Sequence, residues 1–368
     1  MGTILVLGNS SGGLYDFRNE LLLKLLQKHR VVVSLPDEVK TKELAEEGCE
    51  VRFTEINRRG MNPLQDIRLY RSYKKLLKEV KPDMVLLYTI KPDVYGGLAC
   101  RMGKVPYMAT ITGLGSTFQK DNFLKKLIVH MYRTGLKKAE CIFFQNEQNR
   151  RIFEECGIKG KKSLLVHGSG VNLAKHTPVP YPEQERTRFL FIGRIMREKG
   201  IEEFLEAAKA LHGENVTFET LGYCDEDYGE LLDTYEKQGM VTQHGFHTNV
   251  EDYLKDASAI VLPTYHEGMS NVLMEAAATA RPVIATNISG CKEIVEDGVT
   301  GFLCEPKDAA GLQEALKKFL ALPTEERARM GLRGREKMER EFDRNLITDV
   351  YIKAVSYTHL TLPTKRIV

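Results

Sequence analysis

Short apolar runs and longer stretches of helical spacing alternate along the whole chain. In the first half, the apolar runs predict strands at residues 3–7, 30–35, 51–53, 83–88, 107–112 and 141–145. In the second half, they predict strands at residues 188–192, 216–221, 259–263 and 282–286. The stretches between them predict helices at residues 14–28, 68–81, 120–138, 271–280, 309–320 and 325–341, a short helix at 293–297, a glycine-containing turn at 298–302, and helices that begin near residues 201 and 250. This rhythm is typical of parallel sheets covered by helices, so the predicted fold class is α/β.

Length and one proline-rich segment divide the chain into two domains. The 368 residues exceed what a single core usually holds. Residues 177–182 alternate proline with other residues, which favours an extended linker. The predicted domains are therefore residues 1–176 and 183–340. Residues 356–368 break the helical period that precedes them, and we interpret them as a non-native tail.

Charge is unevenly distributed, although the net charge is only +3. Residues 1–180 contain 30 Lys and Arg against 18 Asp and Glu, and the remainder contains 23 against 32. The predicted helix at 68–81 carries Arg68, Arg71, Lys74, Lys75 and Lys78 with a single acid, Glu79. Residues 120–138 set an apolar stripe beside further basic residues: Phe123, Leu124, Leu127, Ile128 and Met131 next to Lys125, Lys126, Arg133, Lys137 and Lys138. A core-packed helix with a solvated flank is one explanation of this stripe. The other is a peripheral position on an anionic membrane surface.

Several other functions lack a signal in the sequence. No nucleic-acid recognition motif accompanies the basic residues. The nine histidines show no metal-ligand spacing, and no apolar run approaches the roughly 20 residues that span a bilayer. The seven cysteines contain no C-x-x-C pair, which indicates reduced thiols. We therefore expect a cytoplasmic protein with neither a metal nor a nucleic-acid partner.

The segment from Thr264 to Glu275 combines an anion site with two carboxylates. It follows a predicted strand and leads into a predicted helix, and the turn between them contains Gly268, Met269, Ser270 and Asn271. A helix N-terminus offers amides and a positive dipole to an anion, and Ser270 or Asn271 can cap it. Glu267 and Glu275 flank this site, and a carboxylate accepts paired hydrogen bonds from sugar hydroxyls. The segment therefore predicts a nucleotide-sugar pocket.

A second pattern, Gly193-Arg194 followed by Lys199-Gly200, also lies between a predicted strand and a predicted helix. Negative charge accumulates on a nucleoside diphosphate as it departs. Arginine offers a forked donor to phosphate oxygens, lysine offers a point charge, and the helix start adds its dipole. The pattern therefore predicts a site that stabilises this leaving group.

Together the two patterns resemble the retaining glycosyltransferases of family 4, which have the GT-B fold of two Rossmann-like domains facing across a cleft. Glu267 and Glu275 stand in the E-x7-E arrangement of that family, and the Gly193–Gly200 segment matches its Gly-Arg-x4-Lys-Gly pattern. Other segments are most similar to bacterial transferases that build lipid-linked oligosaccharides, such as the N-acetylgalactosaminyltransferase of protein N-glycosylation: the 8–13 loop, Phe17-Arg18, Gly113-Leu-Gly-Ser116 and Gly170-Val-Asn172.

The resemblance implies a UDP-sugar donor, an undecaprenyl-diphosphate-linked saccharide as acceptor, retention at the anomeric carbon, and no metal or other cofactor. It implies catalytic roles for Glu267, Arg194 and Lys199, and a ribose contact for Glu275. Further donor contacts would come from Gly268, Met269, Ser270, Asn271, Gly193, Gly222, Phe246, Gly12 and Gly13, and acceptor contacts from Arg18, Gly113 and Gly115. Residues 341–355 would form a helix that returns to the first domain. The enzyme would lie peripherally on the inner face of the plasma membrane.

The chain departs from the family where many relatives place a histidine. The corresponding stretch is Thr110-Ile-Thr-Gly-Leu-Gly115, so no side-chain base is assigned. The acidic run Asp225-Glu-Asp227 falls in an ordinary loop of the family and is interpreted as solvated charge.

Two other functions share parts of the pattern. A hydrolysing UDP-N-acetylglucosamine 2-epimerase has the same two-domain fold and would turn over its substrate without an acceptor. A non-catalytic nucleotide-sugar-binding partner would turn over nothing, and the presence of Arg194, Lys199 and both glutamates argues against it.

Overall fold

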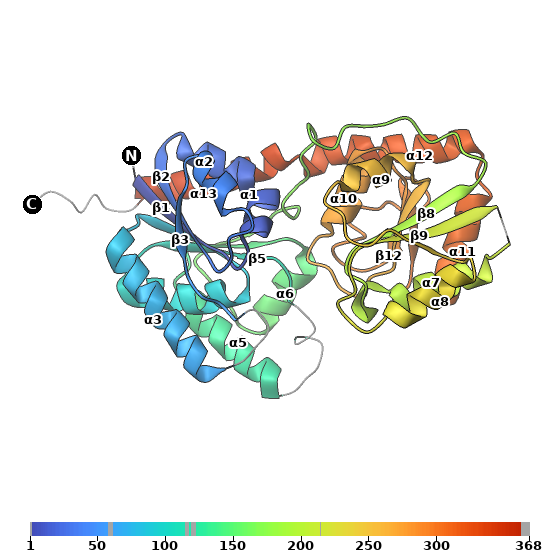
Figure 1. The fold of residues 1–368 in the computed structure, drawn as a ribbon. Helices are drawn as coiled ribbons and strands as arrows, with labels where there is room; N and C mark the ends of the chain where they lie inside the picture. The colour runs from blue at the N-terminus through green and yellow to red at the C-terminus, as the bar shows by residue number, and fades with distance from the viewer. Residues whose placement is uncertain (1, 58–61, 115–117, 119–122, 214, 362–368) are drawn as a thin grey trace, which may run out of the picture. The chain divides into compact units, whose positions relative to one another are not determined.

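The computed structural model divides into two compact units, which are described separately (Figure 1). The first unit contains residues 1–169 and 344–368, and the second contains residues 170–343. The structure describes residues 2–57, 62–114, 118, 123–213 and 215–361.

The first unit is built on a seven-stranded parallel sheet with the strand order β3-β2-β1-β4-β5-β6-β7. Its strands are β1 (Gly2–Leu7), β2 (His29–Leu35), β3 (Glu50–Phe53), β4 (Met84–Tyr88), β5 (Tyr107–Ile111), β6 (Cys141–Phe144) and β7 (Ser163–Leu165). The central strands are apolar on both faces because helices cover both faces of the sheet. The first six strands were predicted. The edge strand β7 was missed, since three exposed residues give no apolar run.

Helices form a layer on each face of this sheet (Figure 1). One layer contains α3 (Pro63–Val80), the π-helix η1 (Pro92–Gly96), α4 (Gly97–Gly103), α5 (Phe123–Leu136) and α6 (Glu147–Glu155). The other contains α1 (Ser11–Leu26), α2 (Thr41–Glu46) and the C-terminal helix α13 (Arg344–Thr361). Apolar stripes of each layer close a separate core against the sheet.

Helix α13 packs on α1 and on the sheet of the first unit. Arg344 pairs with Glu20 at 3.1 Å, and the Tyr351 ring lies 4.1 Å from that of Phe143. The predicted break at residue 356 is wrong, because the helix continues to Thr361 and the Thr358 hydroxyl donates to the carbonyl of Ala354. Serine, tyrosine and threonine are tolerated in a helix, and no proline interrupts these turns. Residues 362–368 lie outside the described residues.

The second unit is built on a six-stranded parallel sheet with the order β10-β9-β8-β11-β12-β13. Its strands are β8 (Thr187–Ile192), β9 (Val216–Leu221), β10 (Thr242–Gln243), β11 (Ala259–Leu262), β12 (Val283–Thr286) and β13 (Gly301–Cys304). Figure 1 shows α7 (Ile201–Ala210), α8 (Gly229–Lys237) and α11 (Ala309–Leu320) on one side, and α9 (Val250–Asp256), α10 (Asn271–Ala278) and α12 (Thr324–Lys337) on the other. The chain leaves β8 in one direction and β11 in the other, so the strand order reverses between these neighbours.

Three predictions for the second unit need correction. Residues 293–297 form a turn followed by irregular backbone instead of a short helix, and the predicted turn at 298–302 leads into β13, which pairs with β12. The proline-rich segment 177–182, expected as the linker, belongs to the second unit, and the chain passes between the units at residues 169–170. Buried Arg281 holds the segment in place, because its guanidinium donates to the carbonyls of Val179 and Pro180 and to those of Leu254 and Lys255.

Candidate functional site

The loop after β11 carries Glu267 and ends where α10 begins at Asn271, as predicted. Ser270 occupies the N-cap position, but its hydroxyl makes no capping hydrogen bond. The Ser270 amide donates instead to the carbonyl of Gly290 at 3.0 Å. Met269 and Ser270 are both buried. Glu275 lies half-buried on α10.

Gly290, in the turn after β12, supports the Glu267 loop and was not predicted. A Cβ atom at this position would lie 2.7 Å from the Cβ of Glu267 and 2.9 Å from its carbonyl oxygen. The φ angle of +92° is also one that side chains rarely adopt. Only glycine fits there, and the Ser-Gly pair just past a strand was the available signal.

The loop after β8 places Lys199 against Glu267. The Nζ atom of Lys199 lies 2.5 Å from Oε1 of Glu267, and their side chains are 19% and 13% exposed. Lys199 ends the short 3₁₀-helix η3 (Arg197–Lys199), and Gly200 turns the chain into α7 with a φ of +76°. A Cβ on Gly200 would come within 2.1 Å of the Pro263 carbonyl, so the two loops pack backbone to backbone. The ion pair therefore lies at the carboxyl ends of β8 and β11, where the strand order reverses and open α/β sheets bind ligands.

Arg194 lies in the same loop and pairs with the loop after β9. Its Nη1 atom lies 2.7 Å from Oδ2 of Asp225, whose side chain is 12% exposed. The two loops meet at Gly193 and Gly222, since a Cβ on Gly222 would lie 1.8 Å from the Gly193 carbonyl. The interpretation of Asp225 as solvated charge is therefore wrong: it is the partner of a predicted catalytic cation. The position of Asp225, four residues past the end of β9, was the signal in the sequence that could have indicated this role.

Phe246 is 64% exposed, and its ring meets that of Tyr223 edge-on at 5.9 Å. The Gly245 carbonyl accepts a hydrogen bond from Gly222, and the His244 imidazole lies 2.7 Å from buried Glu219. Burial alone would raise the pKa of Glu219, but hydrogen bonds from Arg188 and His244 outweigh it and lower the pKa. A charged, buried glutamate thus fixes the loop that presents Phe246. Sequence reasoning missed Glu219 because it lies within a strand.

In the first unit, Gly12 and Gly13 lie in the first turn of α1 and not in a preceding loop. The helix begins at Ser11 because the Ser10 hydroxyl accepts from the Gly13 amide at 3.2 Å. A Cβ on Gly12 or Gly13 would meet nothing closer than 3.5 Å. Gly113 follows β5, and Gly115 lies outside the described residues.

Arg18 is buried in the interior of the first unit, with 7% of its surface exposed. Its guanidinium lies 5.3 Å from the centre of the Tyr88 ring and 5.8 Å from that of Tyr351. Tyr351 comes from α13, more than 300 residues further along the chain, so the sequence could not indicate this packing. Arg18 thus contributes to the packing of α13, and its contact with an acceptor stays a prediction.

The apolar stripe of α5 is divided between the core and the surface, because Ile128 and Met131 pack against the core of the first unit. Phe123 is 82% exposed and Leu127 is 37% exposed, while Leu124, Ile128 and Met131 are only partly buried. The buried residues are Val129, Tyr132, Gly135 and Leu136. On α3, all five basic side chains predicted in the 68–81 stretch are exposed. Core packing therefore explains part of the stripe, and it leaves the exposed side chains of Phe123 and Leu127 unexplained.

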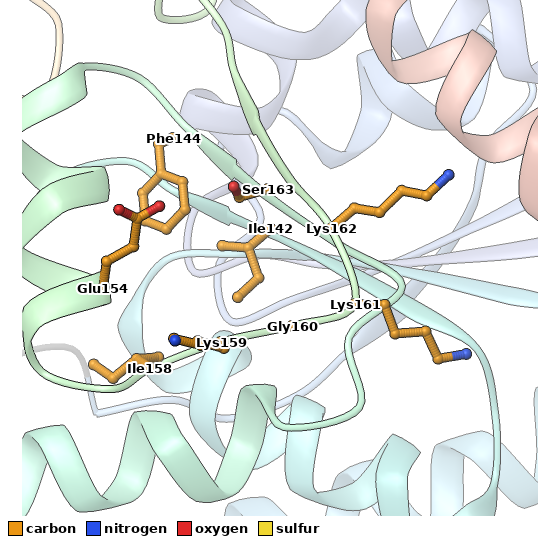
Figure 2. A pocket seen from close by; sticks show the side chains of 9 residues that line it. All are labelled: Ile142, Phe144, Glu154, Ile158, Lys159, Gly160, Lys161, Lys162 and Ser163. Atoms are coloured by element: carbon orange, nitrogen blue, oxygen red, sulfur yellow. The ribbon is translucent and has the colours of Figure 1, made fainter.

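A surface pocket of about 340 Å³ opens beside the edge strand β7 (Figure 2). Ile142, Phe144 and Ile158 contribute apolar side chains to its lining, and Lys159, Lys161 and Lys162 lie around it. No predicted site residue lines it. Across the described ranges, no helix is long and apolar enough to cross a membrane, and no group of three or more His, Cys, Asp or Glu side chains could hold a metal ion.

Two family profiles match the chain, and together they extend over most of its length. "Glycosyl transferase 4-like" matches residues 3–146, and "Glycosyl transferases group 1" matches residues 186–321. The chain therefore belongs to the group 1, family-4-like glycosyltransferases, and the resemblance drawn from the two motifs is confirmed.

Named relatives agree with this assignment. The N,N'-diacetylbacillosaminyl-diphospho-undecaprenol alpha-1,3-N-acetylgalactosaminyltransferase of Campylobacter jejuni is 26% identical over 94% of this chain and 96% of its own length. The UDP-Gal:alpha-D-GlcNAc-diphosphoundecaprenol alpha-1,3-galactosyltransferase of Escherichia coli is 27% identical over 70% of this chain and 71% of its own. These homologues are glycosyltransferases of undecaprenyl-diphosphate-linked saccharides.

Solved structures show the same fold. HepE of Anabaena in complex with UDP-glucose superposes with a TM-score of 0.81, covering 97% of this chain and 100% of that one at 18% identity. This likeness, with the two parallel sheets, confirms the predicted GT-B fold class.

Proposed function

We propose that this glycosyltransferase moves a hexose or N-acetylhexosamine from a UDP-sugar to an undecaprenyl-diphosphate-linked saccharide, with retention at the anomeric carbon and without a metal ion. The observation that carries the proposal is the placement of Arg194, Lys199 and Glu267 in loops at the carboxyl ends of neighbouring strands of one sheet. The donor and acceptor of the named relatives support the choice of substrates.

The second unit supplies the chemistry of the leaving group. As the bond between C1 and the phosphate oxygen breaks, negative charge grows on UDP, and Arg194, Lys199 and the N-terminus of α10 stabilise it. Glu267, held by Lys199, accepts hydrogen bonds from the donor hexose, and Glu275 accepts them from the ribose. Two cations and a helix dipole thus take the place that a divalent metal has in other sugar transferases.

Bond formation and proton transfer occur on one face of the sugar. The acceptor hydroxyl oxygen attacks C1 from the side that the diphosphate leaves, so its proton passes to a departing phosphate oxygen. No side-chain base is required. This agrees with the absence of a histidine from the Thr110–Gly115 stretch.

The first unit supplies the membrane-facing surface. Exposed Phe123 and Leu127 on α5, and Leu64 and Ile67 at the start of α3, offer apolar side chains beside the basic residues of both helices. Anionic lipid stabilises each nearby Lys or Arg by about 1 kcal/mol, so several together hold a peripheral protein. We therefore place the enzyme on the cytoplasmic face of the plasma membrane, with an anionic lipid surface as its partner.

The proposal is tested with a panel of UDP-sugars and undecaprenyl-diphosphate-linked acceptors. Product mass identifies the transferred sugar, and the anomeric configuration decides between retention and inversion. UDP-N-acetylglucosamine without acceptor is the control for epimerase activity. An inverted product, or turnover of the donor alone to a free epimer, would contradict the proposal.

A further inference from the structure

Asp225 holds the guanidinium of Arg194 by a direct ion pair. The contact of 2.7 Å joins a carboxylate that is 12% exposed to an arginine side chain that is 43% exposed. The acid is thus set into the protein, while the cation reaches outward. A guanidinium carries five N–H donors, and this contact uses only one of its nitrogens, so the others can meet phosphate oxygens.

The backbone around Asp225 is tied to the backbone around Arg194. The Ile195 amide donates to the Tyr223 carbonyl at 2.9 Å, and the Asp225 amide donates to the Ile195 carbonyl at 3.1 Å. These bonds extend the pairing of β8 and β9 beyond the strands, as the bridge between Ile195 and Cys224 shows. The carboxylate therefore has a fixed position relative to Arg194.

The next acid fixes the other end of the same segment. Oε2 of Glu226 accepts a hydrogen bond of 2.8 Å from the Arg197 amide, at the first residue of η3. Lys199 ends this 3₁₀-helix. Two successive acids after β9 thus support the segment that carries both cations.

We propose that Asp225 is a positioning residue for glycosyl transfer, which rests on the proposed role of Arg194 at the leaving diphosphate. A long side chain such as that of Arg194 loses rotamer entropy when it binds a ligand. Because Asp225 already holds the guanidinium in place, this entropy is not lost in the reacting complex. A misplacement of about 1 Å at a reacting centre can lower turnover about 100-fold. Asp225 also offsets the charge of Arg194, so it gives no net attraction for UDP. Its loss therefore lowers kcat and leaves the affinity for UDP unchanged or higher.

The experiment compares Asp225→Asn with Asp227→Asn, an exposed acid in the same loop. We expect Asp225→Asn to lower kcat by about 10- to 100-fold, the range found when a partner that orients an active group is removed. The Kd of UDP from calorimetry should stay within about threefold or fall, and Asp227→Asn should match the wild type. Asp225→Glu, which keeps the carboxylate, should have a higher kcat than Asp225→Asn.

A double-mutant cycle separates positioning from a structural role. In the Arg194→Ala background, Asp225→Asn should cause no further loss of kcat, because a residue that acts through Arg194 has nothing left to position. Wild-type kcat in Asp225→Asn, an equal loss with and without Arg194, or equal kcat for the Asn and Glu variants would each overturn the inference. If Arg194→Ala abolishes turnover and Asp225→Asn does not lower it, only the inference fails. If Arg194→Ala itself turns over normally, the proposed role of Arg194 fails with it.

Discussion

Asp93→Asn should stabilise the protein at neutral pH, because Asp93 is buried and its carboxylate finds no hydrogen-bond partner in the described part of the chain. It lies in η1, directly after β4, and is 1% exposed. Neither carboxylate oxygen has a hydrogen-bond partner among the described residues. Burial raises the pKa of Asp93 well above its usual range. Such an acid lowers the free energy of unfolding at any pH above its pKa in the unfolded chain, because the unfolded aspartate is ionised and the buried one keeps its proton.

The size of the effect follows from linkage between protonation and folding. The unfolded aspartate ionises near pH 3.9, whereas the folded one keeps its proton to higher pH. Stability is therefore fully present below about pH 3.9, and each further unit removes about 1.4 kcal/mol until the folded-state pKa is passed. At pH 7 the loss cannot exceed about 4 kcal/mol. Asparagine keeps the shape and cannot ionise, but burying its amide costs about 1–3 kcal/mol, so the net gain at pH 7 is at most about 1–3 kcal/mol.

Neighbouring groups do not titrate in the same window. Tyr73, Tyr88, Tyr132 and Tyr351 all interact electrostatically with Asp93, and burial raises the pKa of each above its usual value. They remain neutral at least up to pH 8. A pH dependence that Asp93→Asn removes therefore belongs to Asp93.

The assay is urea unfolding of the wild type and Asp93→Asn from pH 5 to pH 8. The difference in midpoint should favour the variant at pH 8 and shrink towards pH 5. Asp66→Asn is the matched control, since Asp66 is also buried but pairs with Lys91 at 2.7 Å, and its replacement should destabilise. A variant less stable than wild type at pH 8, or a gain that does not change with pH, would refute the reasoning.

Four further predictions concern activity and binding. Arg194→Ala or Lys199→Ala should lower turnover by about 100- to 1,000-fold in folded protein, measured by single-turnover kinetics, because each removes a donor to a developing oxyanion. Glu275→Ala should weaken UDP itself in calorimetry, whereas Glu267→Ala should spare UDP and harm transfer, and an equal effect on UDP would contradict the division of roles. Excess EDTA should leave turnover intact, and a loss restored by Mg²⁺ or Mn²⁺ would count against metal independence. Association with phosphatidylglycerol vesicles should weaken in 1 M salt, where the Debye length falls to about 3 Å. Replacement by glutamine of four lysines in α5 and the turn after it should weaken this association as well and leave donor hydrolysis intact: Lys125, Lys126, Lys137 and Lys138.

The local features of the fold were accessible from the sequence. The buried strands β8, β11 and β12 follow from apolar runs, since a strand covered on both faces needs no polar side chain. The start of α10 at Asn271 and the bounds of α11 follow from helix-forming composition and breakers nearby. The three-residue edge strand β7 gave too weak a pattern, and the glycine that begins β13 favoured a turn there.

The candidate site was only partly accessible in the same way. Arg194, Lys199 and Glu267 could be named because their residue types and local spacing state the chemistry of a diphosphate and a sugar. The partners of these residues could not be named from the sequence, because Asp225 meets Arg194 only when β8 and β9 lie side by side.

The sequence by itself determined which segments form strands and helices and which residue types can hold a nucleotide sugar, because these depend on periodicity and on side-chain chemistry over a few residues. The tertiary structure alone decided which distant residues meet. Arg18 packs between aromatic rings because α13 returns to the first unit. Glycine is required at position 290 because the backbone there lies too close to Glu267 for a side chain. Such contacts arise from strand order and close packing, which depend on the whole chain and leave no local pattern in it.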